Sequence, residues 1–74
     1  MTTQKSLEIR ARKVLLAREL TKARKEFNYD QEYCAMTVGC NVRTWYRWEN
    51  GLSLPLPIYR AKLVGLIPDV KKLV

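Results

Sequence analysis

The feature that most constrains this chain is a run from Ser6 to Phe27 that contains no Gly, Pro, Asn or Asp. The run is rich in Leu, Ala, Arg, Lys and Glu, which are good helix formers, and it predicts one long helix. At about 100° per residue, one stripe of apolar side chains predicts the core face: Ile9, Leu16, Leu20, Ala23 and Phe27. A second apolar stripe lies nearly opposite and consists of Leu7, Ala11, Val14 and Leu15. Either the first turns fray or this stripe packs against the C-terminal segment, or it forms a dimer contact.

Two short helices are predicted next, and each has its own boundary residues. Asp30 is a good N-cap for a helix over 31–38, and Gly39 ends that helix. Asn41 is a good N-cap for a helix over 42–49. The two short helices are therefore separated by a tight turn that contains Gly, as in a helix-turn-helix unit.

The remaining boundaries come from Asn, Gly and Pro. Asn28 tolerates the left-handed conformation that a helix C-terminus often needs. The other predicted features are a stop at Asn50–Gly51, an extended connection over 53–57, a fourth helix over 58–64 followed by Gly65, and a last short turn over 68–73. The sequence thus predicts an all-α fold of five helices.

Charge restricts the function classes. The chain has 74 residues, with 14 Lys and Arg, 7 Asp and Glu and no His, for a formal net charge of +7. Such a balance favours a polyanionic partner, with nucleic acid ahead of an anionic membrane surface. A His-based triad, a His-metal centre and a two-carboxylate glycosidase are poor fits. We expect no enzyme, cofactor or small-molecule substrate. We also expect no membrane span and no secretion signal.

The two cysteines, Cys34 and Cys40, lie six residues apart, with no second pair and no His to complete a zinc site. We interpret both as small buried apolar residues in a reduced compartment. A disulfide or a redox switch is the alternative.

The segment over 24–51, together with Pro55, resembles the helix-turn-helix of the Cro/CI-type (XRE family) phage and bacterial repressors. The matching residues are Arg24, Gln31, Ala35, Gly39, Thr44, Arg47, Trp48, Glu49, Asn50, Gly51 and Pro55. The resemblance implies a five-helix, lambda repressor-type fold, with the helix-turn-helix at about 31–49 of a single domain over 1–74. Residues 1–15 extend helix one beyond the resemblance. Asn28 stands where the family usually has Gly, and Trp45 replaces a smaller aliphatic residue.

The helix over 42–49 separates two kinds of side chain. At about 100° per residue, Trp45 and Trp48 fall within about 60° of each other, which predicts the core side. Tyr46, Arg43 and Arg47 fall together on the opposite side. Because the major groove admits one helix and Arg pairs bidentately with guanine, we expect base contacts from Val42, Arg43, Tyr46 and Arg47. A solvated basic face is the alternative for the arginines, and packing on the scaffold is the alternative for Val42.

Other residues are expected to position this helix. We expect phosphate contacts from Gln31, Asn41, Thr44 and Asn50. Gln31 lies at a helix N-terminus, which favours an anion, and the resemblance implies the backbone contacts of Gln31 and Asn50. A helix-start role is the alternative for Gln31, and a turn role is the alternative for Asn50. The resemblance also implies a structural ion pair between Arg24 and Glu49, which are otherwise two exposed, unpaired charges.

We therefore expect a sequence-specific double-stranded DNA-binding transcriptional regulator, Cro-like or short repressor-like, in the cytoplasm of a bacterial or phage-infected cell. Useful specificity usually needs two half-sites, so we expect a homodimer on a DNA operator. The alternatives are an antitoxin or anti-repressor type of interaction protein on the same fold and a non-specific nucleic-acid or RNA binder. Selection from a random duplex library would separate specific from non-specific binding, and a co-expressed partner that co-purifies tightly would favour the interaction protein.

Overall fold

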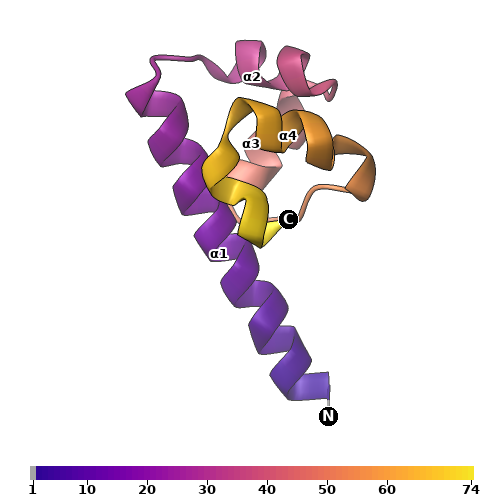
Figure 1. Cartoon of the computed structure of the whole chain (residues 1–74). Helices are drawn as coiled ribbons and strands as arrows, with labels where there is room; N and C mark the ends of the chain where they lie inside the picture. Colours follow the sequence, from indigo (N-terminus) through magenta and orange to yellow (C-terminus); the bar gives the residue numbers. More distant parts are fainter. Residues whose placement is uncertain (1) are drawn as a thin grey trace.

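A computed structural model describes the backbone of residues 2–74 and the side chains of residues 6–74 (Figure 1). Its elements are α1 (Thr2–Glu26), α2 (Gln31–Val38), α3 (Val42–Glu49), the 3-10 segment η1 (Pro57–Tyr59), α4 (Arg60–Leu66) and the 3-10 segment η2 (Pro68–Leu73). Because η1 runs directly into α4, these form five helical stretches, and residues 2–74 contain no strand. The predicted all-α class is confirmed. None of the described helices has the combination of length and apolar character that crossing a bilayer requires.

The molecule is elongated because α1 extends beyond the other helices, which pack together around its C-terminal half and form the body of the protein. The molecule measures 40 × 23 × 20 Å. The C-terminal half of α1 packs against α3 and η2, whereas its N-terminal half leaves the body (Figure 1). We call residues 2–15 the projecting half of α1. Every described side chain in it is exposed except that of Lys13, which is half-buried.

The ends of the short helices follow the predicted local chemistry. The Asp30 side chain accepts a hydrogen bond from the Tyr33 backbone N–H at 2.7 Å. The Asn41 side chain accepts one from the Thr44 backbone N–H at 2.8 Å. Each carboxylate or amide oxygen therefore satisfies a backbone donor that would otherwise lack a partner at a helix N-terminus. The bounds predicted for α2 and α3 are confirmed.

The turns on either side of α2 contain left-handed backbone, as predicted for Asn28. Asn28 has a φ of 59° and Gly39 has a φ of 93°. Asn tolerates this region, since its short polar side chain bonds locally, and Gly has no Cβ to clash.

The fourth helix, α4, begins and ends two residues later than the predicted helix over 58–64. Pro57 begins the tighter segment η1, and α4 extends to Leu66 with Gly65 inside it rather than after it. The Ile67 backbone N–H still donates to the Leu63 carbonyl at 2.8 Å, which closes the last turn. Leu63 and Ile67 are both buried, so packing extends the helix past a residue of low helix propensity.

The core lies where α1, α2, α3 and α4 meet, with η2 against α1 and α4. Its buried side chains are Leu16, Leu20, Ala23, Cys34, Ala35, Val38, Trp45, Trp48, Leu63, Ile67 and Val70. Three of the five residues predicted for the core face of α1 are among them. The prediction is wrong for Ile9, which is 41% exposed on the projecting half, and for Phe27, which is 52% exposed. Phe27 follows the last helical residue, where the helical period no longer applies.

The second apolar stripe of α1 is exposed. Leu7, Ala11, Val14 and Leu15 all face solvent in the described chain. The helix is continuous from Thr2, so these residues lie on regular helix. Leu15 borders a shallow hollow that it shares with Leu73 of η2, so one end of the stripe lies beside the C-terminal segment. A dimer contact through the stripe stays a prediction.

Candidate nucleic-acid interface

Helix α3 has a buried face and an open face. Trp45 and Trp48 are 0% and 2% exposed, and their ring centroids lie 5.7 Å apart. The Trp48 ring also meets Tyr59 edge-on, at a centroid distance of 5.5 Å. Large aromatic side chains contribute much of the packing energy of a small core, so these indoles set the rotation of α3 about its axis.

The open face of α3 has the residues that were predicted to read bases. Arg43 and Arg47 are exposed, and Tyr46 is 52% exposed. Val42 is 42% exposed at the first turn, so much of its side chain remains free of the scaffold. Arg43, Tyr46 and Arg47 make no side-chain hydrogen bond or ion pair within the described chain. Their polar groups are therefore available to a ligand.

The C-terminus of α3 is held by a single carboxylate. Glu49 accepts hydrogen bonds from Arg24 Nε at 2.6 Å and Arg24 Nη2 at 3.1 Å, so the expected ion pair is present and bidentate. It also accepts from Gln31 Nε2 at 3.0 Å and from Trp45 Nε1. The Glu49 side chain is 5% exposed and that of Arg24 is 16% exposed. One carboxylate thus joins α1, α2 and α3.

The hydrogen bonds decide the charge state of this network. Burial alone raises the pKa of Glu49, but donation from Arg24, Trp45 and Gln31 outweighs burial and holds that pKa below its ordinary value. The hydrogen bond to Glu49 raises the pKa of the Arg24 guanidinium. Both groups therefore stay ionised over a wide pH range. Arg24 also donates from Nη1 to the Tyr29 carbonyl at 3.2 Å, which ties the turn between α1 and α2 to the network.

The residues predicted to contact phosphate are partly used inside the protein. Gln31 donates to Glu49, the Asn41 oxygen caps α3, and Asn50 Nδ2 donates to the Tyr46 carbonyl at 2.8 Å. Each amide group carries two N–H donors, so every one of these side chains keeps at least one donor for an outside acceptor. Thr44 is half-buried.

The sequence did not predict the hydrogen bonds that Glu49 accepts from Gln31 and from Trp45. The sequence predicted a phosphate contact or a helix-start role for Gln31, and a core position for Trp45. The separation of four residues between Trp45 and Glu49 on one helix is the signal that could have predicted their contact. No comparable local signal links Gln31 to Glu49, because the two lie on different helices.

Both cysteines are free thiols. Cys34 is fully buried, and burial raises its pKa to about 11. The expectation of burial is wrong for Cys40, which is partly exposed in the turn between α2 and α3. Burial still raises the pKa of Cys40, so neither thiol is activated as a thiolate. Within residues 2–74, no group of three Cys, Asp or Glu side chains could hold a metal ion.

We found no match to this chain among protein-family models, curated proteins or solved structures.

Proposed function

We propose that this protein is a sequence-specific double-stranded DNA-binding transcriptional regulator, with α2 and α3 as a repressor-like helix-turn-helix. The observation that carries the proposal is the division of α3 into two faces. Its indoles lie in the core, while Arg43, Tyr46 and Arg47 lie free on the outside. The resemblance of the segment over 24–51 to Cro/CI-type repressors supports the same function.

The dimensions suit major-groove binding. A helix with its side chains is about 10–12 Å across, and the major groove of B-DNA is about 12 Å wide. Arg43 and Arg47 are four residues apart and so lie about one turn from each other along α3. A guanidinium at each position can donate two hydrogen bonds to the O6 and N7 atoms of a guanine. These arginines, with Tyr46 and Val42, are the proposed base-reading side chains.

Phosphate contacts position the reading helix. Asn41, at the N-cap of α3, is exposed and keeps its amide N–H donors for an outside acceptor. Gln31 and Asn50 each keep one such donor. Helix N-termini favour anions because their free N–H groups and dipoles point outward, and a net charge of +7 steers the protein toward DNA.

The proposed mechanism is occupancy of an operator, which blocks or redirects polymerase in a bacterial or phage-infected cell. A single module buries little surface, so we propose a homodimer bound to two half-sites about 34 Å apart. The exposed second stripe of α1 and the segment after Pro55 are the candidate dimer contacts.

Selection from a random duplex library, followed by footprinting, tests the proposal. We expect an enriched motif with two related half-sites and a footprint on one face of the duplex. Similar affinity for every duplex, without a footprint, would replace the proposal with non-specific binding.

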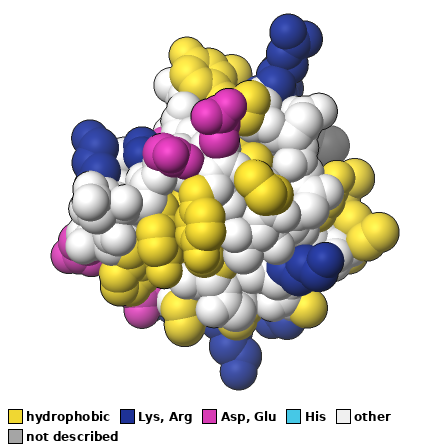
Figure 2. Space-filling view, turned by 90° about the horizontal axis from the view of Figure 1, so that it is seen from above, with side chains coloured by type: hydrophobic (Ala, Val, Ile, Leu, Met, Phe, Trp, Pro, Cys, Tyr) yellow, Lys and Arg dark blue, Asp and Glu magenta, His cyan; other side chains and the backbone are white. Residues whose placement is uncertain are grey.

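A second candidate function is that of an antitoxin or anti-repressor type of interaction protein. Figure 2 looks down on the α2 end of the molecule, where apolar and acidic side chains share the surface. Met36 is 77% exposed, Phe27 and Tyr33 are about half exposed, and Glu32 is exposed on the same helix as Met36. An acidic apolar surface suits a protein rather than DNA. A co-expressed partner that co-purifies tightly, together with a lack of duplex preference, would favour this candidate.

A further inference from the structure

The acidic residues of α1 lie on one side of the helix. At about 100° per residue, its three glutamates, Glu8, Glu19 and Glu26, lie within about 20° of one another. Glu19 borders the hollow that η2 also lines, so the acidic stripe runs along the side of α1 on which η2 packs. Arg24, which pairs with Glu49 of α3, lies about 140° or more from that stripe. The α3 side of α1 is therefore free of acidic residues.

Two basic residues of the projecting half lie on that α3 side. Lys13 and Arg10 fall within about 40° of Arg24 around the helix. They line a shallow hollow together with Ser6, Ile9 and Gly51. A Cβ added at Gly51 would lie 3.8 Å from the Lys13 carbonyl, which places the turn after α3 directly on α1. Neither Arg10 nor Lys13 makes an ion pair within the described chain.

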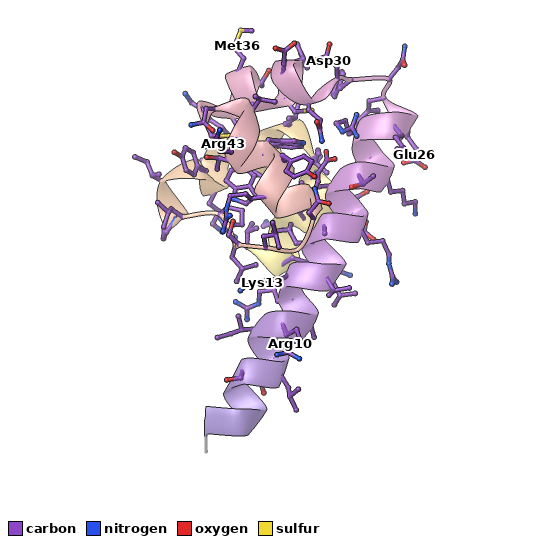
Figure 3. All side chains as sticks on the ribbon, turned by 180° about the vertical axis from the view of Figure 1, so that it is seen from behind. Arg10, Lys13, Glu26, Asp30, Met36 and Arg43 are labelled. Atoms are coloured by element: carbon purple, nitrogen blue, oxygen red, sulfur yellow. The ribbon has the colours of Figure 1, made fainter. Side chains whose placement is uncertain are left out.

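The hollow continues the open face of α3. Arg43, Arg47 and Asn50 follow one another along that face at intervals of four and three residues. Gly51 comes next in the chain and belongs to the hollow. Figure 3 shows Arg43 on α3 with Lys13 and Arg10 below it along the molecule. The base-reading surface and the α3 side of α1 thus meet at the turn after α3.

We propose that the projecting half of α1 is a second DNA-contacting element, in which Arg10 and Lys13 bind phosphates flanking the site read by α3. This inference rests on the proposed function and extends it beyond the helix-turn-helix. The partner chemistry is a row of phosphates, which is the polyanion that a duplex bound by the reading helix would present to this face. At a rise of about 1.5 Å per residue the projecting half is about 21 Å long, or the length of about six base pairs. An element of this size reaches beyond the site that α3 covers.

The double variant Arg10→Gln with Lys13→Gln tests the inference. Each phosphate contact contributes about 0.9 to the slope of log affinity against log salt, so the variant should lose about 1.8 from that slope. When salt is lowered from about 1 M to about 0.15 M, the affinity of the wild-type protein should therefore rise about 30-fold more than that of the variant. Hydroxyl-radical footprints should lose protection at the flank next to the C-terminal end of α3, while the selected motif stays the same.

The matched control is Arg12→Gln with Arg18→Gln, which removes the same charge from the same helix. Both arginines are exposed, and both point about 100° or more away from the midpoint between Arg10 and Lys13. We expect the control to keep the wild-type slope and footprint, and both variants to keep the wild-type melting temperature, since no buried side chain changes.

The outcomes separate this inference from the proposed function. Equal losses in the two variants, or an unchanged slope and footprint in Arg10→Gln with Lys13→Gln, would overturn the inference while leaving an operator-binding protein. Wild-type protein that binds all duplexes equally would overturn the proposed function, and a reduced slope confined to Arg10→Gln with Lys13→Gln would still support the phosphate contact. Wild-type protein that binds no duplex would overturn both.

Discussion

Helix α3 and the projecting half of α1 are both helical, but for different reasons. α3 consists of Val, Thr, Trp, Tyr, Arg and Glu, several of which are mediocre helix formers. Its conformation depends on the Asn41 cap, on two buried indoles and on the Glu49 network. The projecting half of α1 has good helix formers and no buried side chain among those described. Tertiary contacts stabilise the first region, and intrinsic propensity stabilises the second.

This difference has a functional consequence. The proposed reading of bases requires side chains at a defined angle, and the buried indoles of α3 fix the angle of that helix. A helix that contacts only phosphates needs charge and reach, because phosphate contacts carry no sequence information directly. We therefore expect substitutions in α3 and in the projecting half of α1 to differ in their effects on stability and on DNA binding.

The largest expected effect is on the stability of the α3 region. Trp45→Ala removes a fully buried indole and its hydrogen bond to Glu49, and should cost about 3–5 kcal/mol of unfolding free energy. Leu7→Ala on the projecting half should change stability by less than about 0.5 kcal/mol. Chemical denaturation of both variants measures the contrast. Comparable losses would mean that the projecting half is also held by packing, for example in a dimer.

Breaking the ion pair should rank next. Arg24→Ala leaves the Glu49 carboxylate almost fully buried without its cation, and should destabilise the protein by about 3 kcal/mol. The control Glu8→Ala removes an exposed charge from the projecting half and should be almost neutral. The same denaturation curves give both values. If Arg24→Ala were as neutral as this surface control, the pair would contribute nothing to stability.

Removing an arginine that is proposed to read bases should affect binding rather than stability. Arg43→Ala or Arg47→Ala should cost about 1–3 kcal/mol on the selected operator and little on random duplex. The exposed Arg18, on α1, supplies the control Arg18→Ala, which should leave discrimination intact. Titrations of the operator and of the random duplex with each variant, at one salt concentration, measure these affinities. Equal losses on operator and random DNA would reassign these arginines to phosphate contact.

The smallest expected effect is a dependence of stability on acid pH. The pKa of Glu49 is lower in the folded protein than its ordinary value, so the unfolded chain binds this proton more readily. The stabilisation is therefore complete above the unfolded pKa of about 4.3 and is lost as pH falls through the folded pKa. Denaturation at a series of pH values should show this loss, and Glu49→Gln should lack that component. A component of equal size in Glu49→Gln would assign the acid sensitivity to other carboxyl groups.

Local chemistry made much of the fold predictable. Asp30, Asn41 and Gly39 act through hydrogen bonds and φ preferences within a few residues, and the bounds of α2 and α3 followed from them. The inward and outward faces of α3 followed from its period. The prediction failed where distant packing decides: at Gly65, which lies inside α4, and at Ile9, which lies on helix beyond the core.

In the candidate site, too, some features follow from the sequence and others only from the tertiary structure. Sequence alone determined which side chains of α3 point away from the core, because a rigid helix repeats about every 3.6 residues whatever surrounds it. Only the tertiary structure decided that one carboxylate, Glu49, would collect donors from α1, α2 and its own helix. It also decided that Arg10 and Lys13 would lie beside the turn after α3. Such relations depend on how helices cross, and side chains far apart in the chain set those crossings jointly.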